Sequence, residues 1–302
     1  MPENSGGSSP SHPVPAQGAA RALGGLTTRE LVAARIAARA APLVRRRSTD
    51  EVTITAPVAP PVASARPAPA PVADAANDTV VALTPIRKRI AANLRHSIET
   101  AAHTLVVIEV DYSAVEPVRA AHHLSYLPFV GRSVVDSLRQ FPQLNATLTD
   151  DALLVHREIN LGISVDLEFQ GLVVPVVREA DGLRLIPMAD RFRTIAAQAR
   201  ARQLGADDLS GGTFTITNAG SYGTVVSAPI INPPQVAILS TDGVRMRPSA
   251  IADGSGGWSV GVRPIGNLSL SWDHRAFDGA YAAAFLALVR NILEQRDWED
   301  EV

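Results

Sequence analysis

The chain has 302 residues, 46% of them hydrophobic and 19% charged, with a formal net charge of −2 and no cysteine. Its size allows one large core or two small ones, while the near-neutral charge excludes a field that would attract nucleic acid or an anionic membrane. The lack of cysteine excludes disulfides and thiolate catalysis, and the lack of a membrane-length apolar run or a signal-peptide pattern after Met1 leads us to expect a cytoplasmic protein.

Residues 1–79 are predicted to be a disordered N-terminal region that contains one short helix and a linker. Gly, Ser, Pro and Ala dominate roughly the first 24 positions, a composition typical of disorder. Thr27 and Glu30 form a capping-box pattern that predicts a helix, and Pro42 ends it. Residues 56–74 are rich in Pro and Ala, which favours an extended linker.

Residues 80–302 are predicted to form a folded domain, because helical and strand patterns alternate along them. Thr84 and Pro85 predict a helix N-terminus, and Ser113 and Glu116 predict the cap of a second helix. Helices are expected over 86–98, after 113, over 127–141, around 192–199 and from 280; strands are expected over 105–111, 159–166, 172–177, 211–220, 231–239, 244–247, 258–263 and 267–272. Several strands follow one another without a helical crossover, which predicts an α/β domain with a mixed sheet.

The stretch from 267 to 280 combines a strand, a turn and the start of a helix. Apolar residues alternate with serines from Leu268 to Trp272, as in a half-buried strand. His274 falls where that strand ends, a position at which scaffolds often display reactive groups. Asp278 follows four residues later, and we expect it to reach the turn that holds the histidine.

Asp273-His-Arg, two apolar residues and Asp278-Gly-Ala closely resemble the signature of the dihydrolipoamide acyltransferases, the core components of 2-oxo acid dehydrogenase complexes. Further stretches resemble the family in the same order, at 141–145, 171–177, 211–220 and 231–239. The resemblance covers roughly residues 80–302. It implies a chloramphenicol-acetyltransferase-like α/β fold, a homotrimer, and coenzyme A or acetyl-CoA as a substrate. The expected helix at Thr27 faintly resembles the last helix of that family's peripheral subunit-binding domain; the alternative is a helix without a partner.

Three residues are predicted to carry out acyl transfer. The acceptor must lose a proton as it attacks a thioester, and a histidine that is mostly neutral near pH 7 accepts that proton. His274 is the candidate base, the alternative being an ordinary histidine. Thr217 matches a family position whose hydroxyl donates to the tetrahedral intermediate, a contribution of about 3 kcal/mol, or else it is an ordinary β-branched strand residue. Asp278 is predicted to support His274, or to pair with an arginine at a helix N-terminus.

The resemblance also bears on assembly and on coenzyme A binding. In the family the histidine comes from one subunit of a trimer and the hydroxyl from its neighbour, and coenzyme A and the acceptor enter from opposite sides. The sequence contains no phosphate-binding glycine loop, so coenzyme A contacts are expected from scattered groups, with Asn145, Ser240 and Arg132 as candidates. No cluster of His, Cys and Asp has metal-ligand spacing, so no metal is expected.

Three interpretations of the acceptor stay open. The chain is a stand-alone acyltransferase for a small-molecule hydroxyl, such as that of a hydroxymethyl tetronate in antibiotic biosynthesis; or it is the core of a dehydrogenase complex that serves a lipoyl domain in trans; or it is a scaffold without turnover. Lys88 is the only lysine and is expected in a helix, so no lipoyl attachment is expected on this chain. We expect the first, because no lipoyl domain is recognisable and the intact His274, Asp278 and Thr217 argue against the third.

Overall fold

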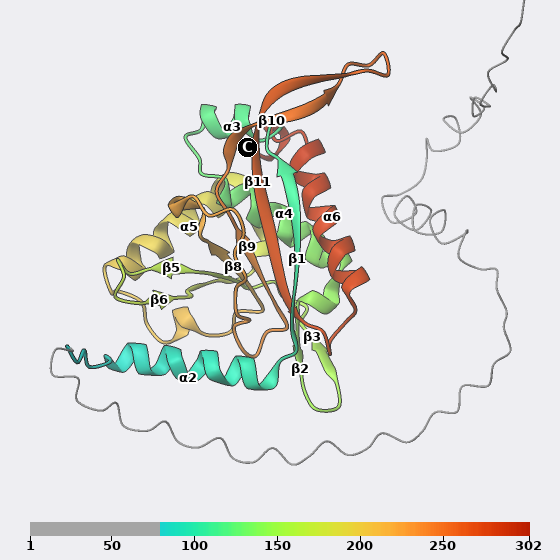
Figure 1. The fold of residues 1–302 in the computed structure, drawn as a ribbon. Coiled ribbons are helices and arrows are strands. Elements are labelled where there is room, and N and C mark those ends of the chain that lie inside the picture. The colour runs from blue at the N-terminus through green and yellow to red at the C-terminus, as the bar shows by residue number, and fades with distance from the viewer. Residues whose placement is uncertain (1–78) are drawn as a thin grey trace, which may run out of the picture. The chain divides into compact units, whose positions relative to one another are not determined.

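The structure, a computed structural model, describes residues 79–302 (Figure 1). The expected helix at Thr27 and the linker at 56–74 lie outside these described residues. The helices are α2 (Pro85–Thr100), α3 (Glu116–Ala121), α4 (Leu127–Gln140), α5 (Leu185–Arg200) and α6 (Gly279–Gln295). Thr84 caps α2 as predicted, because its Oγ1 accepts a hydrogen bond from Arg87 N at 3.3 Å. No helix within 79–302 is both long and apolar enough to cross a bilayer.

A seven-stranded mixed sheet forms the centre of this part of the chain. Its order is β1-β11-β9-β8-β4-β7, with β10 pairing on β11, and the β4–β8 and β8–β9 pairs are parallel. The strands are β1 (His103–Asp111), β4 (Leu161–Ile163), β7 (Val176–Val177), β8 (Phe214–Asn218), β9 (Ala237–Thr241), β10 (Arg245–Ala252) and β11 (Trp258–Asp273). Smaller ladders join β2 (Ala146–Leu148) to β3 (Leu153–Val155) and β5 (Val165–Asp166) to β6 (Leu172–Val173). The predicted α/β fold with a mixed sheet is confirmed.

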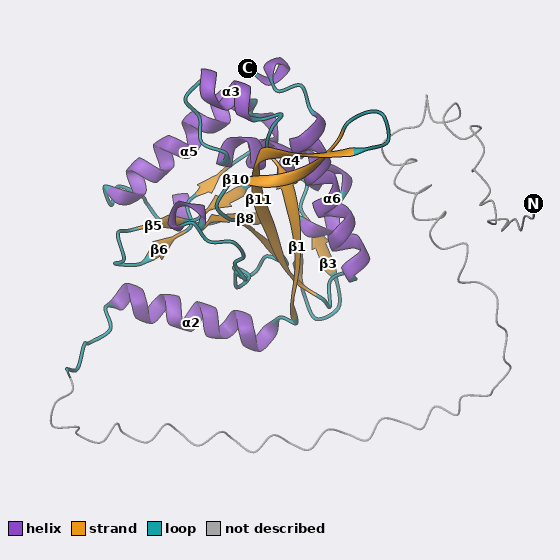
Figure 2. Cartoon of the chain, turned by 45° about the horizontal axis from the view of Figure 1, so that its top comes forward, coloured by secondary structure: helices purple, strands orange, loops and turns teal. Residues whose placement is uncertain are grey.

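Helices α4, α5 and α6 cover one face of the sheet (Figures 1 and 2). Leu268, Leu270 and Trp272 project to this face, because alternate residues of a strand lie on the same side. They are buried in one core cluster with Phe285 and Val289 of α6. The apolar spacing that predicted these helices therefore corresponds to the faces they bury against the sheet.

The opposite face of the sheet is only partly covered. It carries Ser269 and Ser271 of β11, and Leu105 and Val107 of β1, which remain partly exposed. Helix α2 lies apart from the three core helices (Figure 2), and Ser97 is its one buried residue. The candidate site residues lie on or next to this less covered face.

Strand β11 unites two elements that the sequence patterns predicted separately. The expected hairpin strand at 258–263 and the expected strand before His274 form a single strand of 16 residues. Its first half pairs with β10 in a hairpin that projects from the sheet (Figure 1), and its second half pairs with β1 and β9. The hairpin and the His274 turn are therefore the two ends of one strand.

Two predicted features are wrong. Helix α3 begins after Val115, which offers no side-chain cap, so Ser113 lies before the N-cap position; its Oγ donates to Asp111 Oδ1. The expected strands at 159–166 and 172–177 are each broken into two short strands. Ser164 N donates to Ile216 O, so the chain stays beside β8 up to this residue; β4 and β7 belong to the large sheet, while β5 and β6 pair with each other.

Candidate active site

His274 lies in the turn that follows β11. Its backbone N–H donates to Ala102 O at 2.9 Å, which ties the turn to the segment before β1. Its imidazole is exposed, and the ring centroid lies 5.8 Å from that of Trp272. Trp272 is buried and donates from Nε1 to Phe277 O at 3.1 Å, which closes the turn from the inside. An exposed imidazole on a turn held by hydrogen bonds is suited to accept a proton from a ligand.

The two neighbours of His274 hold each other. Arg275 Nη2 lies 2.6 Å from Asp273 Oδ2, and Asp273 Oδ1 also accepts from Ala102 N at 3.1 Å. Burial by itself raises the pKa of Asp273, but the hydrogen bonds from Arg275 and Ala102 outweigh it and hold this pKa below its ordinary value. Arg275 is thus the partner of a nearby acid, and the ion pair fixes the main chain on both sides of the histidine.

Asp278 occupies the N-cap position of α6. Its main-chain oxygen accepts from Tyr281 N at 3.0 Å, and its side chain is exposed. No hydrogen bond or ion pair among residues 79–302 joins its carboxylate to His274. Within one chain the carboxylate lies at a helix N-terminus, where a negative charge is favourable, and its support of His274 stays a prediction.

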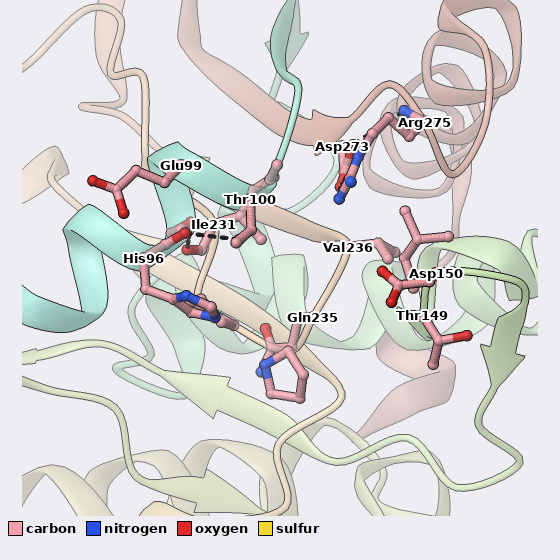
Figure 3. A pocket seen from close by; sticks show the side chains of 15 residues that line it. His96, Glu99, Thr100, Thr149, Asp150, Ile231, Gln235, Val236, Asp273 and Arg275 are labelled. Atoms are coloured by element: carbon pink, nitrogen blue, oxygen red, sulfur yellow. Dashed lines mark hydrogen bonds and ion pairs between the residues drawn. The ribbon is translucent and has the colours of Figure 1, made fainter. Parts of the chain in front are cut away.

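A pocket of about 340 Å³ opens beside the His274 turn (Figure 3). Its walls come from the last turns of α2, the β2–β3 turn, the segment 231–236, and the Asp273–Arg275 pair. Figure 3 shows Asp150 and Thr149 near the ion pair, with His96 of α2 farther along the wall. A ligand in this pocket would have polar and charged groups from several separate segments beside it.

Thr217 lies on β8 in a row of three hydroxyl residues. It is paired with Ser240 of β9, which is paired with Ser269 of β11. Paired residues of neighbouring strands project to the same side of a sheet, so the row lies on the face opposite the core helices. Thr217 is half-buried, whereas Ser240 and Ser269 are fully buried.

The strand register separates Thr217 from His274. Thr217 is level with Ser269, and His274 follows Ser269 by five positions along β11. At a rise of about 3.3 Å per residue, that places the two residues about 17 Å apart along the strand. One chain therefore does not bring the candidate base and the candidate oxyanion donor together.

The three candidate coenzyme A contacts are enclosed by the fold. Arg132 is buried, where its guanidinium donates to Leu183 O and pairs with Asp136. Asn145 is buried and donates from Nδ2 to two main-chain oxygens, while Ser240 is fully buried. None of the three offers an accessible polar group to coenzyme A in this structure, so these candidate contacts find no support.

Asp273 had no predicted role, although the acid stands inside the motif that identified His274. The sequence feature that could have indicated a role is the position of Asp273. It continues the alternation of Ser269 and Ser271, so a charged residue is placed on a partly buried face of the strand. Among residues 79–302, no group of three or more His, Cys, Asp or Glu side chains is placed to hold a metal ion.

Residues 75–298 match the family described as 2-oxoacid dehydrogenases acyltransferase, catalytic domain. The chain is 38% identical over 229 residues to the dihydrolipoyllysine-residue acetyltransferase component of the pyruvate dehydrogenase complex of Mycobacterium bovis, covering 72% of this chain and 41% of that protein. It is 33% identical over 282 residues to the succinyltransferase component of the 2-oxoglutarate dehydrogenase complex of Haemophilus influenzae, covering 90% of this chain and 64% of that protein. The chain thus spans less than two thirds of the length of either relative.

Solved structures agree with these relatives. A probable dihydrolipoamide acetyltransferase from Listeria monocytogenes superposes with a TM-score of 0.69 at 33% identity, covering 74% of this chain and 98% of that one. The dihydrolipoamide acetyltransferase of Azotobacter vinelandii superposes with a TM-score of 0.70 at 31% identity, covering 76% of this chain and 98% of that one. That crystal structure accompanied an enzymatic investigation of one serine, one histidine and one asparagine in the catalytic mechanism.

Proposed function

Because the chain belongs to the family of 2-oxoacid dehydrogenase acyltransferases, we propose that it is the acyltransferase core of such a complex. It moves an acyl group between coenzyme A and a dihydrolipoyl group carried on a separate domain or chain. The observation that carries this proposal is the Asp273-His-Arg turn, in which His274 is exposed and its two neighbours line a polar pocket.

The relatives favour a dihydrolipoyl group as the acceptor over the small-molecule hydroxyl that the sequence led us to expect. The curated relatives are components of pyruvate and 2-oxoglutarate dehydrogenase complexes, and their names specify a lipoyllysine residue. The expectation of a small-molecule hydroxyl acceptor in antibiotic biosynthesis finds no support among them. A dihydrolipoyl thiol is also the easier acceptor, because a thiol loses its proton far more readily than an alcohol does.

The proposed chemistry assigns one proton acceptor and one hydrogen-bond donor. His274 removes the proton of the attacking thiol, and the sulfur forms a bond to the carbonyl carbon of acyl-CoA. The Thr217 hydroxyl donates to the oxygen that becomes negative in the tetrahedral intermediate. When the intermediate collapses, the bond to the coenzyme A sulfur breaks, and the protonated His274 returns its proton to that sulfur.

The separation of the two residues supports a site shared between subunits. Thr217 and His274 lie about 17 Å apart along one chain, too far to act on one carbonyl group. The Azotobacter enzyme's catalytic investigation named a histidine and an asparagine four positions apart, the spacing of His274 and Asp278. We propose that a homotrimer in the cytoplasm brings His274 of one subunit to Thr217 of the next.

The β10–β11 hairpin supports the same assembly. One of its faces is apolar on both strands, and Trp258, Val260 and Val262 on this face are 73%, 81% and 65% exposed. A two-stranded ribbon with an exposed apolar face is only marginally stable in water, so a neighbouring subunit that covers it would stabilise it.

The acceptor is tested by direct comparison of nucleophiles. Purified protein is incubated with acetyl-CoA and either dihydrolipoamide or a hydroxymethyl tetronate, and free coenzyme A is measured by chromatography. We expect turnover with dihydrolipoamide that is at least about a hundredfold faster than with the alcohol. Turnover with the alcohol alone would restore the small-molecule interpretation.

The shared site is tested by mixing two inactive variants. His274→Ala and Thr217→Ala are co-expressed with different tags, and doubly tagged assemblies are isolated. A doubly tagged closed trimer holds two copies of one variant and one of the other, so one of its three sites combines an intact His274 with an intact Thr217, and we expect about a third of the wild-type activity. Doubly tagged assemblies that stay inactive would exclude a site completed between subunits.

A further inference from the structure

The segment 219–231, here named the strap, connects the two ends of the candidate site. It begins two positions after Thr217, where Ala219 N donates to Thr241 O at 3.1 Å. It ends at Ile231, whose N–H donates to His103 Nε2 at 3.1 Å and whose oxygen accepts from Ser97 Oγ at 2.6 Å. His103 is paired with Asp273, so the strap runs from the level of Thr217 to the level of the His274 turn.

The middle of the strap lies along the less covered face of the sheet. A cavity of about 470 Å³ is lined by strap residues 228–230 together with Leu105 of β1 and Ser271 of β11. Figure 3 shows the end of the strap, Ile231, beside Thr100 and Glu99 of α2. The strap therefore lies along this face between the Thr217 level and the His274 level.

Asp242 holds the Thr217 end of the strap. Its carboxylate is only 5% exposed, and its Oδ1 accepts from Thr224 Oγ1 at 2.6 Å and from Ser227 Oγ at 2.7 Å. Its Oδ2 accepts from Ser269 Oγ at 3.3 Å. No arginine, lysine or histidine of residues 79–302 forms an ion pair with it. A buried carboxylate held by hydroxyl groups alone is costly to keep, which suggests a purpose beyond stability.

Main-chain contacts press the same part of the strap against Asp242. Gly243 N donates to Thr224 O at 2.9 Å, and Asn267 Nδ2 donates to Val225 O at 2.8 Å. A Cβ at Gly220 would lie 2.8 Å from the main-chain oxygen of Asp242, so only glycine allows this approach. The Asp242 carboxylate and these main-chain contacts together hold residues 220–227 of the strap, beginning three positions after Thr217. This set of contacts is here named the latch.

The latch is continuous with the hydroxyl row that contains Thr217. Ser269, which donates to Asp242, is paired with Ser240, and Ser240 is paired with Thr217. Ser240 Oγ has no hydrogen-bond partner among residues 79–302, so the row joins the latch to Thr217 through the pairing of neighbouring strands. Asn218 Oδ1 secures the other side, accepting from Gly220 N at 3.0 Å and from Thr241 Oγ1 at 3.2 Å.

We propose that Asp242 is a positioning residue for acyl transfer, which latches the strap so that the Thr217 hydroxyl is held in one orientation toward the reacting carbonyl. The inference rests on the proposed function, and Asp242 acts through Thr217 without touching the substrate. The loss of the carboxylate frees the chain that follows Thr217 and lowers the rate of the chemical step more than it weakens substrate binding.

The test uses Asp242→Asn in the full chain, with acetyl-CoA and dihydrolipoamide as substrates. We expect kcat to fall at least about tenfold while both KM values change less than about threefold. In the Thr217→Ala background the same change should lower kcat less than about twofold, because the residue it acts through is already gone. The proposal would be overturned if Asp242→Asn lowered kcat by the same factor in the wild-type and Thr217→Ala backgrounds. It would also be overturned if the kcat of Asp242→Asn stayed within twofold of wild type.

Asp253→Asn is the matched control. Asp253 at the hairpin tip also accepts from a serine hydroxyl and from main-chain N–H groups, Ser255 and Gly257, but it is exposed. We expect unchanged kinetics from it. If Asp242→Asn does not fold, the double variant Thr224→Val with Ser227→Ala removes the strap donors and keeps the carboxylate's bond to Ser269, and the same kinetic criteria apply.

Hydrogen exchange separates a failure of this inference from a failure of the proposed function. In Asp242→Asn, peptides covering 214–231 should exchange faster than in Asp253→Asn, while peptides of α6 should not change. Unchanged exchange over 214–231 would overturn the latch even if the kinetics fell. If the wild type transfers no acyl group, the proposed function fails, and exchange alone then decides whether Asp242 holds the strap.

Discussion

At the His274 end of β11, most hydrogen bonds that shape the turn come from residues within five positions of each other, such as Arg275 to Asp273 and Trp272 to Phe277. At the Thr217 end, the carboxylate of Asp242 is bound by residues 15 to 27 positions away. One half of the proposed site is therefore built locally, and the other half is assembled from segments that meet only in the folded chain.

This difference affects how each half responds to change. A locally built turn depends on a short motif, so substitutions inside the motif should act on it directly. A half that is assembled by register and by a strap depends on several distant groups, so its weakest points lie outside any motif. His274, Thr217 and the hairpin therefore allow each half, and the connection between them, to be changed separately.

The largest effect is expected at the local half. His274→Ala removes the proton acceptor, and we expect kcat to fall about a thousandfold with little change in the KM for acetyl-CoA. The measurement is release of coenzyme A with dihydrolipoamide as acceptor, and circular dichroism serves as a control for folding. Activity within tenfold of wild type would mean that another group accepts the proton.

At the assembled half, Thr217→Ala removes one donor to the tetrahedral oxyanion. We expect turnover to fall about a hundredfold, close to 3 kcal/mol in the barrier, with little change in substrate binding. Thr217→Ser keeps the hydroxyl and should remain within about fivefold of wild type, which makes it the matched control. Equal activity of wild type and Thr217→Ala would reject the role.

The connection between the halves is tested on the hairpin. Val260→Asp introduces a charge on its exposed apolar face, and we expect dissociation of the assembly, with activity falling about tenfold at low protein concentration. Ser259→Asp adds the same charge at the neighbouring position, which projects to the opposite face, and should leave the assembly intact. Sedimentation velocity distinguishes the two outcomes; a fully assembled Val260→Asp would exclude this face from the interface.

A smaller effect is expected from the ion pair beside His274. Arg275→Ala leaves the Asp273 carboxylate without its cation, and we expect about 1 to 2 kcal/mol lower stability in urea at pH 7, because the half-exposed arginine is screened by water. The hydrogen bonds lower the pKa of Asp273, so their stabilisation is present above the ordinary aspartate value near 4 and is lost as pH falls through the lower folded value.

The lowered pKa of Asp273 determines how the effect of Arg275→Ala should depend on pH. The stability difference between wild type and Arg275→Ala should be largest near pH 7 and should shrink as the pH falls below about 4. A difference that grows on acidification would contradict the assignment of Asp273 as the titrating partner.

The smallest effect is expected from Ser240→Ala. Ser240 Oγ is fully buried and has no hydrogen-bond partner among residues 79–302, so its removal should change stability by less than about 1 kcal/mol in either direction. The KM for acetyl-CoA should not change, because the hydroxyl is closed to solvent. A clear rise in that KM would revive Ser240 as a coenzyme A contact and would imply that the row opens during catalysis.

Several features of the fold were predictable because they depend on residues close in sequence. The alternation from Leu268 to Trp272 predicted a strand, and the helical spacing from Ala280 predicted α6. The Thr84 cap was also predicted, because a cap involves only the first turn of its helix. The capping box at Ser113 was wrong because the N-cap position of α3 is Val115, two positions later.

The sequence by itself determined the class of fold, the family, and the turn that presents His274, since periodicity and a short motif act over a few residues. Only the tertiary structure decided that Arg132 is enclosed, that Thr217 and His274 lie at different levels of one sheet, and that Asp242 latches the strap. The physical reason is that strand register and side-chain burial depend on segments far apart along the chain, and a local pattern carries no record of which distant residue it will meet.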